Sequence, residues 1–206
     1  MKKNILLIII VVVLVIVLGL GTYFIIQNKN EKNINSDLGN NNLNNGSEKI
    51  LVVYYSAQNH TENIAKKIAN NLNADIFEVE PKNEYTSEDL NYNNSSSRVS
   101  REHNDESLRN IELKTTSVNN WEEYDTILIG YPIWWGVAAW PINNFVKDND
   151  FTGKIVIPFC TSASSGIGQS DTLLKELTNT GNWMNGHRFS SSASDSVIKE
   201  FTDSIK

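Results

Sequence analysis

Three continuous apolar runs, each followed at once by a loop of polar or small residues, constrain the fold of this 206-residue chain most strongly. The runs are residues 50–55 (ILVVYY), 124–130 (YDTILIG) and 153–159 (GKIVIPF). Continuous apolar runs are typical of strands buried on both faces, as in a parallel sheet covered by helices. An alternating segment at 75–80 and a short apolar one within 184–189 bring the expected strands to five.

Amphipathic segments alternate with these runs. Helical spacing is found in residues 61–72, in 140–148, around the LLKEL segment at 173–177, and in 196–205. Strands that alternate with helices predict an α/β fold, with three layers around a doubly wound, five-stranded parallel sheet. Residues 81–120 are polar and only partly helical in pattern, so we assign them to the second crossover, enlarged by a long polar loop.

The chain begins with an uncharged, mostly apolar stretch of 22 residues, from 5 to 26. As a helix it would measure about 33 Å, enough to cross a hydrocarbon core of about 30 Å. A cleaved signal peptide would have a shorter apolar core and a small-residue exit, and a lipoprotein signal would need a cysteine after the stretch. We therefore expect residues 1–26 to form an uncleaved anchor, with one transmembrane helix in the lipid bilayer.

Lysines flank the apolar stretch on both sides, at positions 2 and 3 and at 29 and 32, so the positive-inside rule favours a cytoplasmic N-terminus only weakly. That orientation would give a single-pass protein of the cell membrane with an extracytoplasmic domain; the opposite orientation stays open. Residues 27–48 contain nine Asn and little to bury, which predicts a disordered linker. Residues 49–206 would then form the folded domain.

Charge and composition argue against several kinds of site. The chain has a net charge of -6, and we expect no nucleic-acid partner because phosphate neutralisation needs clustered Lys and Arg. The single cysteine, Cys160, excludes an internal disulfide and a cysteine-based metal cluster. His60, His103 and His187 are scattered without metal-ligand spacing, so we expect no metal site.

Three loops should meet at the carboxyl edge of the sheet, where open parallel sheets bind ligands. The first, residues 56–61 (SAQNHT), joins a strand to a helix N-terminus and has no Lys or Arg. Its hydroxyl, amide and backbone N–H groups can hold a phosphate. Asn59 can adopt the left-handed conformation that Gly would usually supply. The alternative is that Ser56 or Thr61 merely caps the helix.

The second loop is residues 131–136 (YPIWWG) and the third is residues 160–168 (CTSASSGIG). Two adjacent Trp after a buried strand suggest an aromatic wall for a flat ligand, although one of them could belong to the core. Small residues and glycines in the third loop allow a backbone to approach a ring closely; the alternative is a plain flexible loop. We interpret Cys160 as a small buried residue and not as a nucleophile.

In their order and separation, the segments YSAQNHTENIA, IGYPIWWGVAAWPINNFV and PFCTSASSGIGQS resemble the flavodoxin family. The similarity is greatest to a branch with P-I-W-W/Y-G and T-S-x-S-S-G-I-G loops, and it covers residues 49–206. It implies a flavodoxin-like fold with strand order 2-1-3-4-5 and one non-covalent FMN. The phosphate loop of this family characteristically lacks basic residues, as the first loop does here.

The resemblance also implies site residues, none of them catalytic. The phosphate would be held by Ser56, Gln58, Asn59, His60 and Thr61. One side of the isoalloxazine would be flanked by Pro132, Ile133, Trp134, Trp135 and Gly136. The polar edge of the ring or the ribityl chain would contact Thr161, Ser162, Ala163 and Gly166.

The chain departs from the family pattern at two points. Where the family often has T-G-N-T, this chain has Q-N-H-T, so His60 either adds a proton-dependent contact to the phosphate or faces solvent. The third loop has no Tyr to stack on the flavin, which could leave the second ring face open to a substrate or partner.

The expected function is therefore that of a membrane-tethered, FMN-binding redox protein that carries electrons between partner proteins. One alternative is a flavin-dependent reductase of quinones or similar acceptors, which would use the open ring face. An alternative of another class is a non-redox binding or sensing module that has lost the flavin. Failure to bind FMN would indicate the module, and steady NAD(P)H oxidation would indicate the reductase.

Overall fold

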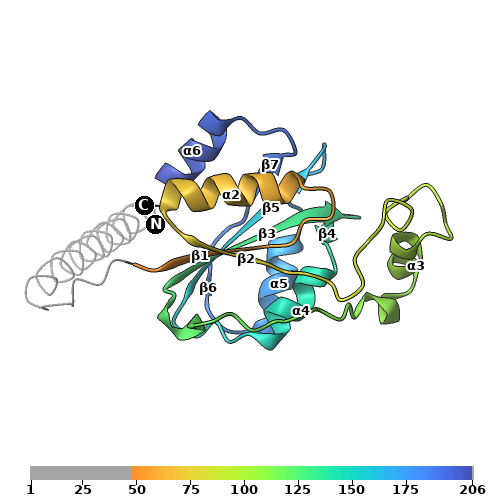
Figure 1. Ribbon diagram of the computed structural model, residues 1–206, viewed down its shortest axis with the longest axis horizontal. Coiled ribbons are helices and arrows are strands. Elements are labelled where there is room, and N and C mark those ends of the chain that lie inside the picture. Colours follow the sequence, from red (N-terminus) through yellow and green to blue (C-terminus); the bar gives the residue numbers. More distant parts are fainter. Residues whose placement is uncertain (1–47, 206) are drawn as a thin grey trace, which may run out of the picture. The chain divides into compact units, whose positions relative to one another are not determined.

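The computed structural model describes residues 48–205, in which strands and helices alternate (Figure 1). The predicted anchor at 1–26 lies outside these residues, as does the predicted linker at 27–48 except for its last residue. Between residues 48 and 205, no helix is long and apolar enough to cross a membrane.

One parallel sheet forms the centre of the domain, with the strand order β2-β1-β3-β5-β6. Its long strands are β1 (Ile50–Tyr54), β2 (Asp75–Glu78), β3 (Thr126–Trp134) and β5 (Ile155–Ser162). The fifth position, beside β5, is shared by two short parallel strands, β6 (Asn182–Trp183) and β7 (His187–Ser190). Counted along the chain, this is the predicted order 2-1-3-4-5, so the flavodoxin-like fold class is confirmed.

Helices cover both faces of the sheet, which gives the predicted three layers (Figure 1). One face carries α2 (His60–Leu72) and α6 (Asp195–Asp203). The other face carries α4 (Pro141–Asp148) and α5 (Ser170–Thr178). All four helices coincide with segments whose apolar spacing predicts a helix.

Alternate side chains of β1 fill two separate cores. Val52 packs with Ile64 and Ile68 of α2 in one core, while Val53 packs with Phe145 of α4 in the other. Full burial of such side chains stabilises the fold by roughly 1.5–3 kcal/mol each. This two-sided burial explains why the strands read as continuous apolar runs.

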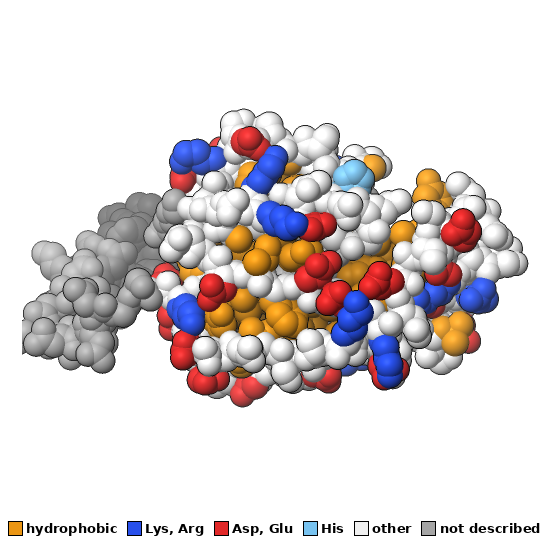
Figure 2. Space-filling model, viewed as in Figure 1, with side chains coloured by type: hydrophobic (Ala, Val, Ile, Leu, Met, Phe, Trp, Pro, Cys, Tyr) orange, Lys and Arg blue, Asp and Glu red, His pale blue; other side chains and the backbone are white. Residues whose placement is uncertain are grey.

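Strand β2 lies at one edge of the sheet, and its Ile76 is exposed. On the side of the molecule seen in Figure 2, charged groups lie between the apolar side chains. Lys49 forms ion pairs with Glu123 and with Asp75 of β2, and Lys114 forms one with Glu80. Charged residues beside an open edge strand disfavour pairing with another chain.

Strand β3 is longer than the apolar run predicts. Its pairing with β5 continues past Gly130, as far as the pair Pro132–Thr161. The strand ends at Trp134, and a two-residue turn leads into the antiparallel strand β4 (Val137–Ala138). Most of the expected loop at 131–136 is therefore the end of a strand and the turn of a hairpin, because the ladder with β5 extends the strand.

The second crossover makes an excursion at residues 82–112, which we name the crossover insert. Its base is closed by antiparallel pairing of Pro81 with Leu113, and Lys82 N donates to Glu112 O at 2.8 Å. The insert contains α3 (Arg98–Asn104) and the 3₁₀ helix η1 (Glu106–Arg109), and a further 3₁₀ helix, η2 (Trp121–Glu123), precedes β3. Figure 1 shows α3 beyond the carboxyl ends of the strands, away from both sheet faces.

Candidate functional site

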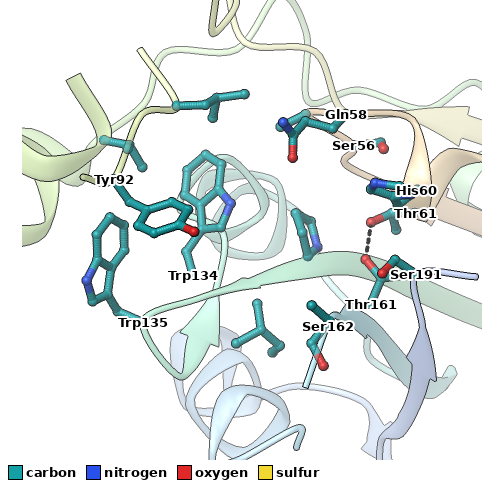
Figure 3. A pocket seen from close by; sticks show the side chains of 16 residues that line it. Ser56, Gln58, His60, Thr61, Tyr92, Trp134, Trp135, Thr161, Ser162 and Ser191 are labelled. Carbon is teal, nitrogen blue, oxygen red and sulfur yellow. Dashed lines mark hydrogen bonds between the residues drawn. The ribbon is translucent and has the colours of Figure 1, made fainter. Parts of the chain in front are cut away.

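A pocket of about 340 Å³ lies at the carboxyl ends of the central strands. In Figure 3, Ser56, Gln58, His60, Thr61 and Ser191 lie on one side, and Tyr92, Trp134 and Trp135 lie on the other. The pocket thus has a polar end and an aromatic end. Its full lining consists of Ser56, Ala57, Gln58, His60, Thr61, Leu90, Tyr92, Val99, Pro132, Ile133, Trp134, Trp135, Thr161, Ser162, Ala163 and Ser191.

The polar end is built around the first turn of α2. The residue before the helix is Asn59, with the predicted left-handed backbone (φ 62°), and its side chain makes no capping hydrogen bond. Neither alternative cap is used: Thr61 Oγ1 is hydrogen-bonded to Thr161 Oγ1 at 2.8 Å, and Ser56 Oγ has no partner among the described residues. The first-turn N–H groups therefore have no side-chain acceptor, which leaves the positive end of the helix dipole for an anion.

The hydroxyl of Ser56 is the clearest mark of a ligand at this end. Its Oγ is buried, and it forms no hydrogen bond within residues 48–205. An unsatisfied buried polar group costs about 1–3 kcal/mol, so native proteins rarely keep one without a reason. Because Ser56 lines the pocket, an acceptor bound there would satisfy this hydroxyl.

The aromatic end is built on the hairpin between β3 and β4. Trp135 and Gly136 form its turn, and both have positive φ, 46° and 81°. This is the pattern of a type I′ turn, which right-twisted hairpins favour. The other four non-glycine residues with positive φ between 48 and 205 are all Asn, so Trp135 is the one bulky residue held there. Backbone strain of this kind clusters at ligand sites.

The two tryptophans of the hairpin play different parts. Trp134 is half-buried, with edge-on ring contacts to Tyr55 at 5.8 Å and to Tyr85 at 5.1 Å. Trp135 is 42% exposed and stacks on His103 of α3, with ring centroids 4.3 Å apart. Both roles considered for this pair, core and ligand wall, are therefore present. Trp134 packs on the core, and both rings line the pocket.

The third loop begins with the last residues of β5. Arg188 of β7 donates to Ser162 Oγ at 3.0 Å and to Ser162 O at 2.9 Å, which fixes the backbone where it passes the pocket. Cys160 points into the core, and burial raises the pKa of its thiol to about 12 despite the nearby Arg188. The thiol is therefore neutral at physiological pH and is not an activated nucleophile.

Eleven of the fourteen predicted site residues line the pocket, and three do not. Asn59 lines a smaller neighbouring cavity, Gly136 lies in the hairpin turn, and Gly166 is exposed beyond the end of β5. The structure thus brings the three predicted loops together.

Five lining residues were not predicted: Ala57, Leu90, Tyr92, Val99 and Ser191. Ala57 lies within the first loop, and Ser191 follows the carboxyl end of β7, a position that the strand-end rule could have indicated. The other three belong to the crossover insert, whose polar sequence has no periodicity that would bring it to the site.

The chemistry of the lining suits binding more than acid–base catalysis. It contains hydroxyls, an amide and aromatic rings, with His60 and Tyr92 as its titratable side chains and no carboxylate. Residues 48–205 contain no group of three or more His, Cys, Asp or Glu side chains that could hold a metal. The pocket could hold a flat aromatic group at one end and an anion at the other.

Comparison with known proteins agrees with this geometry. The family profile for flavodoxins matches residues 49–205. A candidate flavoprotein from Bacteroides eggerthii is 38% identical, with a TM-score of 0.69, over 77% of this chain and 98% of its own. A candidate flavoprotein from Bacteroides uniformis is 36% identical, with a TM-score of 0.69, over 77% of this chain and 99% of its own.

A third solved structure is a flavoprotein from Lactobacillus acidophilus in complex with FMN. It is 24% identical, with a TM-score of 0.56, over 76% of this chain and 99% of its own. At this identity the similarity shows a shared fold. All three crystallised chains consist almost wholly of the matched domain, which indicates that such a domain folds without the segment that precedes it here.

Proposed function

This chain belongs to the flavodoxin family, and from that premise we propose that it binds one FMN in the pocket at the carboxyl edge of the sheet and carries electrons between partner proteins. The observation that carries the proposal is the buried hydroxyl of Ser56, unpartnered at the polar end of a pocket whose opposite end is aromatic. A dianionic phosphate on a flat ring system matches these two ends.

The proposed phosphate contacts come from neutral groups. Ser56, Gln58 and Thr61 supply hydroxyl and amide groups, and the first turn of α2 supplies backbone N–H groups and the helix dipole. His60 lines the pocket beside them, and we include it among the proposed phosphate contacts.

The proposed ring contacts are with Trp134 of the hairpin, Pro132 and Ile133 of the same strand, and the backbone from Thr161 to Ala163. FMN would supply the redox chemistry, while the protein supplies binding, orientation and electrostatics. Residues 49–206 contain 14 Lys and Arg against 21 Asp and Glu, a net charge of -7. Such surroundings disfavour extra negative charge on the bound group.

Titration of residues 48–206 with FMN and with riboflavin tests the proposal. We expect one-to-one binding of FMN with quenched flavin fluorescence, because stacked aromatic side chains quench a flavin. Riboflavin lacks the phosphate and should bind about 100-fold more weakly, since hydrogen bonds to a charged group contribute about 1.5–3 kcal/mol each. Equal affinities would show that the polar end holds no phosphate.

The same protein separates the alternatives. Absence of FMN binding at micromolar protein would favour a non-redox binding or sensing module. Steady oxidation of NAD(P)H by the FMN-loaded domain, with a quinone as acceptor and no added reductase, would favour a reductase over a carrier.

Membrane attachment is a further part of the proposal. We propose that residues 5–26 anchor the protein in the cell membrane and that the domain lies on the extracytoplasmic side. The support is the length of the uncharged apolar stretch and the weak lysine bias around it. The redox donor and acceptor would then be proteins that reach this side of the membrane.

A further inference from the structure

The crossover insert places one large aromatic side chain at the pocket. This side chain belongs neither to the hairpin nor to the strand ends. Tyr92 lines the pocket, yet it is 71% exposed. Its side chain makes no hydrogen bond or ring contact that can be seen within residues 48–205, although its backbone N donates to Leu90 O at 2.9 Å. An aromatic ring of this size normally gains stability by being covered.

The segment that carries Tyr92 is held by a series of turns. Thr86 and Asp89 bond to each other reciprocally, with Thr86 N donating to Asp89 Oδ2 at 3.0 Å and Asp89 N to Thr86 Oγ1 at 3.1 Å. Val99 N of α3 donates to Asp89 O at 3.0 Å, and Asn94 N donates to Asn91 O at 3.0 Å. The position of Tyr92 is therefore fixed on both sides along the chain.

The same segment is tied to the aromatic end from behind. Tyr85 packs edge-on against Trp134 at 5.1 Å, and its hydroxyl donates to Glu102 at 2.6 Å. Arg98 lies over the Tyr85 ring at 3.8 Å and also donates to Glu102, at 2.8 Å. Burial and the Glu102 hydrogen bond raise the pKa of the Tyr85 hydroxyl, so it stays a donor at physiological pH. The crossover insert is thus packed against the tryptophan hairpin through Tyr85.

Apolar atoms of the insert continue the wall next to Tyr92. Leu90 and Val99 also line the pocket, and Val99 is buried. The third loop passes the pocket with Ser162 and Ala163 and supplies no aromatic ring there. At the aromatic end, the hairpin therefore supplies Trp134 and Trp135, and Tyr92 is the one aromatic lining residue that comes from a separate segment.

We propose that Tyr92 is a ligand-covering residue: its ring contacts the flat group bound at the aromatic end, and so retains the ligand in the pocket. The inference rests on the proposed FMN binding. It assigns to the crossover insert a role in binding in addition to its role as a connection. The exposure of Tyr92 in the free protein follows, since its partner is the ligand itself.

Three variants of the domain of residues 48–206 test this role by flavin titration and stopped-flow release. Tyr92→Ala should raise the dissociation constant for FMN about tenfold, because a lost aromatic contact costs up to about 1.5 kcal/mol beyond the area it buries. Most of the change should lie in the dissociation rate, as is usual for contact mutants. Tyr92→Phe keeps the ring and should stay within about twofold of the unchanged domain.

Leu108→Ala is the matched control, because Leu108 lies in the same insert and is 46% exposed but does not line the pocket. It should bind FMN like the unchanged domain. Because Tyr92 and Leu108 are both exposed, all three variants should fold, and circular dichroism and thermal unfolding check this.

The outcomes separate the two levels of the proposal. If the unchanged domain binds no FMN, the proposed function fails. If it binds FMN and Tyr92→Ala binds with the same affinity and release rate, the function stands and the role of Tyr92 is overturned. A Tyr92→Phe variant as weak as Tyr92→Ala would overturn the ring contact too, since only the hydroxyl would matter.

Discussion

At the scale of single residues, the buried hydroxyl of Ser56 should have opposite effects on the stability of the apo domain and on FMN affinity. It has no partner among residues 48–205, so it adds no hydrogen bond to the stability of the free domain. Ser56→Ala should leave the free energy of unfolding of the apo domain unchanged or slightly higher, because a desolvated hydroxyl is removed. FMN affinity should fall about tenfold, since a hydrogen bond to a charged phosphate is lost.

Riboflavin makes this experiment specific, because it offers no phosphate to Ser56 and its affinity should not change. Ser165→Ala is the control, since Ser165 is exposed beyond β5 and does not line the pocket. An equal loss of FMN and riboflavin affinity in Ser56→Ala would place the serine at the ring and not at the phosphate.

Two left-handed backbone conformations show which local features can be predicted from nearby sequence and which depend on tertiary contacts. The left-handed backbone of Asn59 was predictable, since Asn tolerates that conformation, and Asn73, Asn120 and Asn179 adopt it as well. The same conformation at Trp135 was not, because it follows from the pairing of β3 with β4 and from the stacking of Trp135 on His103.

At the scale of elements, the fit between β3 and β5 depends on the absence of a side chain at Gly130. A Cβ there would lie 2.2 Å from Cζ of Phe159, which is fully buried in the core beneath α2 and α6. Gly130→Ala should therefore lower the free energy of unfolding by about 1–3 kcal/mol, the usual cost of overpacking. Urea denaturation of the apo domain measures it.

Gly166→Ala provides the contrast within the same protein. The nearest atom to a Cβ at Gly166 is 4.0 Å away, and the residue is exposed. Its substitution should change stability by less than about 0.5 kcal/mol, as is usual at the surface. Equal effects at the two glycines would show that Phe159 can move without cost.

The elements differ in how far the sequence predicts them. The buried strands and the four covering helices follow from apolar periodicity, because two-sided burial leaves a continuous run and one-sided burial a helical stripe. The crossover insert follows from no such pattern, since it is held by turn hydrogen bonds and by long-range contacts such as Tyr85 with Trp134. That is why Leu90, Tyr92 and Val99 were missed while three strand-end loops were found.

At the scale of the whole molecule, the sequence joins a complete α/β domain to an apolar stretch of membrane-spanning length. The flavodoxin profile matches residues 49–205, so the matched domain begins directly after the predicted linker. Removal of residues 1–47 should leave FMN affinity unchanged within about twofold.

The full chain should sediment with the membrane fraction of a bacterial host and resist extraction by high salt, whereas residues 48–206 should stay in the soluble fraction.

The side of the membrane can be read from a single introduced thiol. Cys160 is fully buried and its pKa is raised to about 12, so the natural chain offers a membrane-impermeant maleimide almost no reactive thiolate. Glu176→Cys, on the exposed side of α5 and away from the pocket, adds one accessible thiol to the full chain. Labelling in intact cells, with none in the unchanged chain, is the expected result for an extracytoplasmic domain. Labelling only after lysis would place the domain in the cytoplasm, where FMN is made, and would reverse the predicted orientation while leaving the anchor and the flavin site intact.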